Sequence, residues 1–263
     1  MSTKGVADVV FCLDASDSMQ PCIDSVKTHI SSFLEGLKSD RQRSWDVRFD
    51  FLAHYAGRGE GGTVGHGHFS LYHDGEQGEG DDAISALYPA GQGRRGRFFT
   101  TDLVEFKRGL DKVKVKSDEG PLIALDSSLD FPWRKAAECH RVVIFMTDEP
   151  FETSVAPEVE RPFLEEIQQK TQDLRVLLFI VAPESPLYEE LAEVDKSEYE
   201  AVDGQSAGLA NVDFRTLLSG IGKSVSVSPP NQQGATTEKR VKRGLFGQAG
   251  WGTIGGVDAS DHT

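Results

Sequence analysis

The sequence predicts one α/β domain built on a doubly wound, mostly parallel sheet, with helices on both faces and one antiparallel edge strand. Three apolar runs point to this fold class, at residues 6–13, 141–147 and 175–182. Such runs are typical of strands that are buried on both faces of a parallel sheet. Stretches with helical periodicity separate them, which predicts βαβ crossovers.

The first helix is predicted after Pro21, where apolar residues recur at gaps of three and four and so share one face. These residues are Ile23, Val26, Ile30, Phe33, Leu34 and Leu37. Residues 47–51 then alternate apolar and polar side chains, which predicts a half-buried strand. The same alternation in His68–His73 predicts the antiparallel edge strand.

Further helices follow along the chain. They are predicted at residues 81–87, 103–113, 121–131, 162–174, 186–194 and 212–224. Thr101 and Asp102 offer an N-cap to the second of these, and Pro121 suits the first turn of the third. Residues 199–202 are predicted to form the last strand.

The composition changes at Ser228, where two prolines follow. We expect one domain over residues 1–227 and a flexible tail over residues 228–263. Within the tail, residues 238–251 place Lys239, Arg240, Lys242 and Arg243 before Leu245, Phe246 and Trp251. Basic and aromatic side chains together predict docking to a groove with an acidic rim, on a partner or on this chain. The alternative is a disordered tail in which the aromatic residues have no role.

Charge and cysteine content narrow the function classes. The 263 residues carry a formal net charge of −14, which argues against nucleic-acid binding. Three cysteines without a CxxC pair indicate a reducing compartment. The sequence shows neither a signal-peptide pattern nor an apolar run of the roughly 20 residues that a membrane span needs. We therefore expect a cytoplasmic protein with no membrane association.

Two predicted strands each end at a carboxylate, Asp14 and Asp148. Ligands of open parallel sheets bind at the carboxyl ends of strands, so these two residues are expected to share a crevice. Ser16 and Ser18 add hydroxyl oxygens, and an all-oxygen set of this kind suits Mg²⁺ or Mn²⁺. The alternative is structural, with a serine that caps the next helix and an Asp148 that begins a turn.

These residues carry a resemblance to a known family. The stretch Asp14-Ala15-Ser16-Asp17-Ser18 resembles the DxSxS motif of the metal-ion-dependent adhesion site in von Willebrand factor A domains. The strand that ends at Asp148 is similar to the second acidic motif of that family. The resemblance covers residues 6–224. It implies a parallel-rich sheet with Mg²⁺ at its upper edge, no catalysis, and a protein partner that supplies an acidic residue to the ion.

One position departs from the family pattern. The family commonly places a Thr in the loop before its next helix, whereas residues 116–122 of this chain contain none. Comparison with the family favours Glu119 as the third metal-site residue, followed by Asp118, with Thr101 as an alternative. An acidic ligand here implies tighter cation binding and weaker recruitment of a partner carboxylate.

The family resemblance also implies an adaptor role in a bacterial stress, signalling or defence system, beside an AAA-type ATPase or a kinase or phosphatase. The competing interpretation is a metal-dependent hydrolase or phosphatase that uses Asp14 or a metal-bound water. Ser16 stands where an aspartyl phosphotransferase would have a second Asp, and neither GxSxG nor GxxxxGK[ST] occurs. A zinc site is a further alternative, and it would use His54, His66, His68 and His73.

Overall fold

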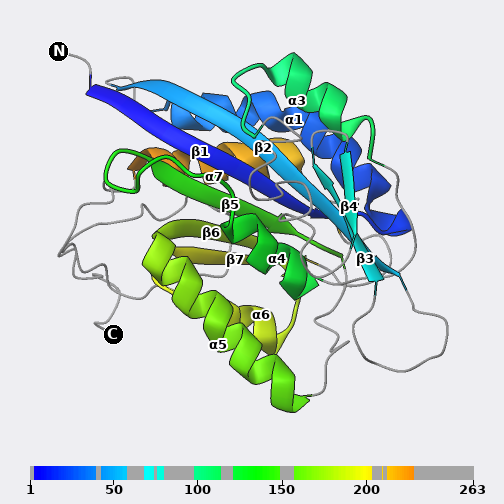
Figure 1. Ribbon diagram of the computed structural model, residues 1–263. Coiled ribbons are helices and arrows are strands. Elements are labelled where there is room, and N and C mark those ends of the chain that lie inside the picture. The colour runs from blue at the N-terminus through cyan, green and yellow to red at the C-terminus, as the bar shows by residue number, and fades with distance from the viewer. Residues whose placement is uncertain are drawn as a thin grey trace, which may run out of the picture.

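The computed structural model describes residues 3–39, 43–57, 68–73, 76–79, 98–113, 121–148, 157–202, 209 and 212–227 (Figure 1). The predicted tail at residues 228–263, its docking segment and the helix predicted at 81–87 lie outside the described residues. None of the described helices combines the length and the apolar character that a bilayer crossing requires.

A seven-stranded sheet forms the centre of the fold, in the order β4-β3-β2-β1-β5-β6-β7. The strands are β1 (Thr3–Asp14), β2 (Arg43–Gly57), β3 (His68–His73), β4 (Glu76–Glu79), β5 (His140–Met146), β6 (Val176–Pro183) and β7 (Ser197–Val202). Five neighbouring strands of this sheet are parallel, namely β2, β1, β5, β6 and β7. The prediction of a mostly parallel α/β sheet is therefore confirmed.

One detail of that prediction needs correction. His68–His73 pairs antiparallel with β2, but it does not occupy the edge of the sheet. Strand β4 pairs with its other side, also antiparallel, and takes the edge position. Strand β4 was not predicted, because Glu76–Glu79 contains no apolar residue and periodicity does not reveal such a strand.

Helices cover both faces of the sheet (Figure 1). They are α1 (Gln20–Leu37), α3 (Leu103–Leu110), α4 (Pro121–Leu129), α5 (Pro157–Leu174), α6 (Pro186–Leu191) and α7 (Phe214–Val227), with a short 3₁₀ turn η1 at Asp17–Met19. Residues of α1, α3 and α7 share one hydrophobic core, and residues of α4, α5 and α6 share the other. The sheet is thus doubly wound, as predicted.

Strand β1 explains why the apolar runs are continuous. Val9, Phe11 and Leu13 enter the core beneath α1 and α7. Val10 and Cys12 point to the opposite face and enter the core beneath α4 and α5. Successive side chains of a strand alternate between faces, so a strand that is covered on both sides must be apolar at nearly every position.

Helices α1 and α7 cross at two glycines. A Cβ atom built on Gly36 would lie 2.1 Å from the carbonyl oxygen of Ser219, and one on Gly222 would lie 2.2 Å from the carbonyl oxygen of Phe33. Both distances are far below van der Waals contact, so the two helix backbones approach as closely as they do because neither residue has a side chain.

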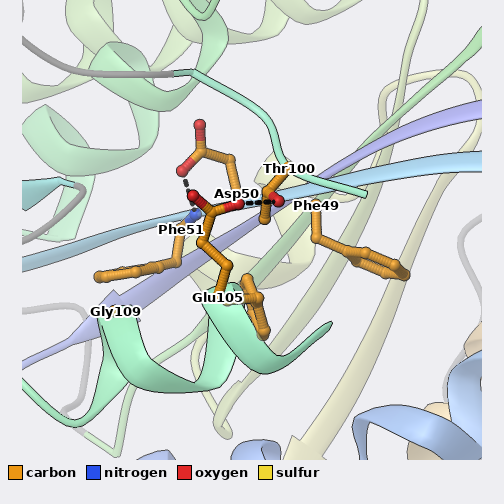
Figure 2. Close-up of a pocket in the computed structure, with 7 residues that line it drawn as sticks. Phe49, Asp50, Phe51, Thr100, Glu105 and Gly109 are labelled. Carbon is orange, nitrogen blue, oxygen red and sulfur yellow. Dashed lines mark hydrogen bonds between the residues drawn. The ribbon is translucent and has the colours of Figure 1, made fainter. Parts of the chain in front are cut away.

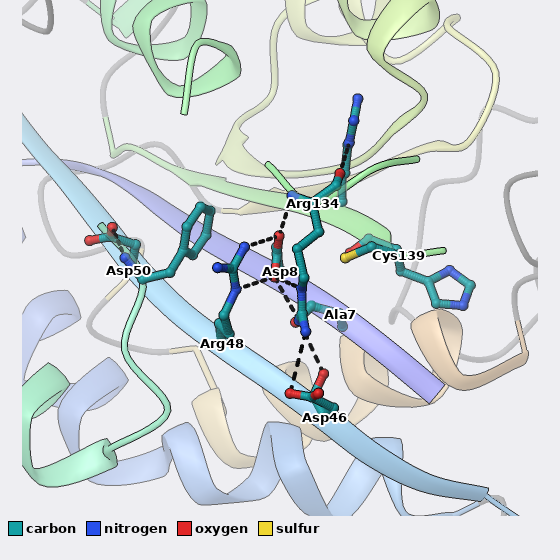
Figure 3. A network of polar contacts seen from close by, with 10 residues as sticks. Ala7, Asp8, Asp46, Arg48, Asp50, Arg134 and Cys139 are labelled. Atoms are coloured by element: carbon teal, nitrogen blue, oxygen red, sulfur yellow. Dashed lines mark hydrogen bonds and ion pairs between the residues drawn. The ribbon is translucent and has the colours of Figure 1, made fainter. Parts of the chain in front are cut away.

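A buried ionic network joins β1, β2 and the segment before β5 (Figure 3). The Asp8 carboxylate is fully buried and accepts hydrogen bonds from Nε and Nη2 of Arg48 at 2.8 and 2.6 Å. Arg134 donates to the same carboxylate from its backbone N at 2.8 Å and from Nε at 2.7 Å. The Arg48 guanidinium also lies 4.6 Å from the ring centroid of Phe99. This network anchors residues 98–100 and 131–139 to the sheet.

Candidate functional site

The two predicted carboxylates lie at the same edge of the sheet. Asp14 is the last residue of β1, and Asp148 follows the end of β5 by two residues. These strands are parallel neighbours, and their register pairs Leu13 with Met146. Parallel strands end at a common edge, so the pairing of β1 with β5 brings together residues that are far apart in the sequence.

Asp14 is held firmly by the protein. Its side chain is fully buried, and Oδ1 accepts a hydrogen bond from the backbone N of Ser16 at 2.8 Å. Its Oδ2 accepts a hydrogen bond from Oγ1 of Thr147 at 2.9 Å. The Asp14 carboxylate is therefore fixed at both oxygens, by its own loop and by the neighbouring strand.

Thr147 belongs to the candidate site but was not predicted from the sequence. It is fully buried, and it lies between the end of β5 and Asp148. A threonine at the end of a strand is ordinary in a β-rich segment, so its residue type alone carries no functional signal. Its position directly before a strand-ending carboxylate was the available clue.

The two serines lie together beside Asp14. Oγ of Ser16 is 3.0 Å from Oγ of Ser18, and Ser16 is buried while Ser18 is exposed. Ser16 precedes the 3₁₀ turn but makes no side-chain capping hydrogen bond there. The residue before α1 is Met19, which makes no such bond either. The structure therefore gives no support to the alternative that Ser16 is a helix cap.

Asp148 differs from Asp14 in its hydrogen bonding. Its Oδ1 is buried and has no hydrogen-bond partner among the described residues. Burial raises the pKa of the Cys22 thiol well above its ordinary value, and the carboxylates of Asp148 and Asp14 raise it further. Both carboxylates thus act on one buried thiol, which donates to Sδ of Met146 at 3.9 Å.

The donor set fits a hard cation better than a soft one. Asp14, Ser16, Ser18 and Asp148 offer carboxylate and hydroxyl oxygens, the ligands that Mg²⁺ and Mn²⁺ prefer. A buried carboxylate oxygen without a partner is costly, and a cation would offset that cost. Within the described ranges, no three His, Cys, Asp or Glu side chains are grouped to hold a metal ion. Such a cation would therefore depend on the two serine hydroxyls as well.

Three residues were candidates for the third metal-site position. Glu119 and Asp118 lie outside the described residues. Thr101 is exposed, and its neighbour Thr100 bridges to Phe49 in the middle of β2. Val9 of β1 pairs with Phe49, whereas Asp14 pairs with position 54, five residues further along β2. At about 3.3 Å per residue, these two positions of β2 are roughly 16 Å apart. The structure thus separates Thr101 from the other candidate residues.

The zinc alternative involves four histidines. His54, His68 and His73 belong to β2 and β3, and His66 lies outside the described residues. The structure describes only the backbone at His54, His68 and His73, so the zinc site stays a hypothesis from the sequence.

A small cavity lies between β2 and α3, beside Asp50 and Glu105 (Figure 2). Its volume of about 20 Å³ is close to what one water molecule occupies. Asp50 accepts hydrogen bonds from the backbone N of Phe51 at 2.9 Å and of Phe99 at 2.8 Å. Glu105 accepts one from the Thr100 hydroxyl. The two carboxylates therefore serve local structure, and the cavity is too small for a substrate.

Comparison with known proteins places the fold. No family model matches the chain, and no curated protein matches its sequence. A von Willebrand factor type A structure from Catenulispora acidiphila is similar over 86% of this chain and 44% of its own, with a TM-score of 0.50 and 14% identity.

Two further structures show weaker likeness. Proximal thread matrix protein 1 from the mussel byssus matches with a TM-score of 0.43 and 16% identity, over 82% of this chain and 46% of its own. The pilus adhesin SpaC from Lactobacillus rhamnosus GG matches with a TM-score of 0.42 and 11% identity, over 84% of this chain and 30% of its own. The chain thus spans less than half the length of each of these proteins. At such identities the likeness concerns the fold, and this chain has a fold similar to that of the von Willebrand factor type A structure.

Proposed function

We propose that this chain is a non-enzymatic, metal-dependent protein-interaction module. The observation that carries the proposal is the buried Oδ1 of Asp148, which has no hydrogen-bond partner among the described residues and lies at the sheet edge where Asp14 ends β1. A bound Mg²⁺ or Mn²⁺ would supply a positive centre able to accept an acidic side chain from a partner protein.

The four candidate ligands would contribute to cation binding in different ways. Asp148 supplies an oxygen to which no described residue donates a hydrogen bond, and the Oγ atoms of Ser16 and Ser18, 3.0 Å apart, supply two neutral ligand oxygens. Asp14 supplies negative charge from a fixed position, since Ser16 N and Thr147 Oγ1 hold its two oxygens. A site of fixed carboxylates and neutral hydroxyls favours binding over turnover, because the described side chains beside it offer no general base and nucleophile pair.

The fold agrees with this proposal without specifying the partner. A structure named von Willebrand factor type A shares it at low identity. The adaptor role beside an AAA-type ATPase or a kinase or phosphatase stays a prediction from the family resemblance.

The test is isothermal titration with Mg²⁺ and Mn²⁺ of the wild-type chain and of the Asp148→Asn and Asp14→Ala variants. We expect one cation per chain in the wild type and a loss of at least tenfold in affinity in each variant. Lys170→Gln, a change on α5 away from the site, serves as the control and should bind as the wild type does. Equal affinity in all four proteins would refute the metal site.

Binding and catalysis are separated by two further measurements on the same variants. A pull-down from an extract of the producing cells, with Mg²⁺ or with EDTA, should retain a partner that Asp148→Asn loses. Hydrolysis of p-nitrophenyl phosphate should stay at background. Metal-dependent turnover that disappears in Asp148→Asn would instead support the hydrolase interpretation.

A further inference from the structure

Strand β7 forms an open edge of the sheet in the part of the chain that the structure describes. Strand β6 pairs with one side of it, from Leu178 opposite Ser197 to Pro183 opposite Val202. Backbone N–H and C=O groups of a strand point alternately to its two sides, so half of those in β7 point away from β6. An edge of this kind is a template for one more strand.

Two side chains of β7 each have a buried polar atom with no hydrogen-bond partner in the described part of the chain. They are Oγ of Ser197, which is fully buried, and Oε2 of Glu200. Burial also raises the pKa of the Glu200 carboxyl. Buried polar atoms in native proteins nearly always have a hydrogen-bond partner. Ser197 and Glu200 lie on opposite faces of the strand, so a single added strand, with side chains on both faces, would reach both.

Glu200 shares its face of the sheet with Glu198. Glu198 is 5% exposed, and its carboxylate oxygens are each 3.5 Å from the hydroxyl of Ser224 in α7. Two carboxylates spaced by two residues therefore lie along one face of an open edge. The side chains that match this pattern are cations with the same spacing on a neighbouring strand.

We propose that residues 239–243 of this chain, Lys-Arg-Val-Lys-Arg, add as a strand to the outer edge of β7. Arg240 and Lys242 are two residues apart, as Glu198 and Glu200 are, so in an extended conformation both basic side chains face the two carboxylates. The added backbone satisfies the outward N–H and C=O groups of β7. The proposal is independent of the metal site.

The position of α7 makes this contact accessible. Ser224 contacts Glu198 three residues before α7 ends at Val227. The chain therefore leaves the described fold close to the start of β7. Twelve residues lead from Val227 to Lys239, and at about 3.3 Å per residue they reach roughly 40 Å. The segment can lie along β7, and being part of the same chain raises its effective concentration there.

Disulfide trapping in the full chain tests the contact. Ala201→Cys places a thiol at an exposed position of β7, and single cysteines are introduced one at a time at positions 239–243. Neighbouring strands lie about 4.8 Å apart, which is within the range that a disulfide bridges. The native Cys12, Cys22 and Cys139 are buried and do not compete. Val104→Cys, exposed on α3, is the matched control for Ala201→Cys.

We expect a cross-link within one chain for Ala201→Cys with at least one tail position, at a yield several times that of Val104→Cys. Equal yields at the two positions would overturn the proposal. Cross-links that join two chains and disappear on dilution would also overturn it, and would assign the edge to a second copy.

Hydrogen exchange of the full chain provides the second measurement. The outward amides of β7 should be protected in the wild type, and R240E/K242E should lower that protection at least tenfold. Because both changes lie outside the described core, circular dichroism should remain that of the wild type. K107E/R108E alters the same number of charges at the end of α3 and should leave β7 unchanged. Unprotected β7 amides in the wild type would refute the added strand.

Discussion

Thr147 donates a hydrogen bond from Oγ1 to Oδ2 of Asp14 at 2.9 Å, across 133 positions of sequence. Both residues are fully buried. The bond joins the end of β5 to the end of β1, so it connects the two strand ends that carry the candidate site. The Thr147 hydroxyl restrains rotation of the Asp14 carboxylate, which makes Thr147 a positioning residue.

Thr147→Val should therefore lower the free energy of unfolding of the metal-free protein by about 1.5–3 kcal/mol, the range for a hydrogen bond to a charged group. Thr147→Ser retains the hydroxyl and should recover most of that loss. Urea unfolding in EDTA measures both. Thr171→Val is the control, since Thr171 is equally buried but donates to the neutral carbonyl of Ile167. An equal loss in the two valine variants would contradict the role given to Thr147.

Asp14 and Asp148 should respond in opposite ways to neutralisation in the absence of metal. Asp14→Asn replaces one of two accepting oxygens with an N–H₂ group that faces a donor, and should cost about 2 kcal/mol. Asp148→Asn removes charge from a site whose buried Oδ1 has no partner among the described residues, and should leave stability unchanged or higher. Thermal unfolding in EDTA measures the difference. Similar losses in both variants would show that Asp148 has a structural partner.

Alanine at the α1–α7 crossing should destabilise the protein even though alanine favours helices. Gly36→Ala and Gly222→Ala each force a methyl group against a backbone carbonyl oxygen, at 2.1 and 2.2 Å. Overpacking of this kind lowers the free energy of unfolding by about 1–3 kcal/mol. Gly109→Ala in α3 is the control. Its Cβ would meet the Phe51 ring at 2.7 Å, and a ring yields more readily than a helix backbone. Chemical unfolding should show that both crossing variants are less stable than Gly109→Ala. The reverse order of stability would refute a rigid crossing.

The Asp8 network predicts a dependence of stability on pH. Burial alone would raise the pKa of Asp8, but hydrogen bonds from Arg48 and Arg134 outweigh burial and hold that pKa below its ordinary value of 3.8. A lowered carboxyl pKa contributes stability that is fully present above pH 4 and is lost as the pH falls through the folded value.

Asp8→Asn should consequently be much less stable than the wild type at pH 6, by about 3–5 kcal/mol, because Arg48 and Arg134 lose the buried carboxylate that both contact. The gap should be narrower at pH 2.5, because this pH is below the ordinary pKa of 3.8 and the Asp8 carboxyl of the unfolded wild type is protonated there. Urea unfolding at both pH values measures it, with Glu166→Gln on the exposed surface of α5 as the control. A gap that stays constant across this range would show that the ionisation of Asp8 does not contribute.

Burial explains which parts of this fold the sequence could predict. The central strands were predictable because β5 and β6 are covered on both faces and need apolar residues almost throughout. Strand β2 runs from Arg43 to Gly57, although only residues 47–51 were predicted. Its polar residues Arg48 and Asp50 are partnered by Asp8 and by the backbone of Phe99, and such tertiary partners leave no trace in periodicity.

The candidate site shows the same division. Asp14 and Asp148 were predictable because a carboxylate after an apolar strand is unusual for a buried segment. Thr147 was not, since its role depends on the pairing of β1 with β5. The open edge at β7 was also missed, because strand order is a property of the assembled sheet and not of any single segment.

The central place of β1 has a consequence for how the chain folds. Its two neighbours are β2 and β5, and the contact with β5 pairs Ala7 with His140. Closing the loop between these two residues costs conformational entropy before the strand contacts form. Topologies rich in such distant pairs therefore fold slowly. During synthesis β1 can pair with β2 early, but its other side has no partner strand until β5, at His140–Met146, has been made. Over that interval an apolar strand edge stays open, which makes the nascent chain a candidate for chaperone binding.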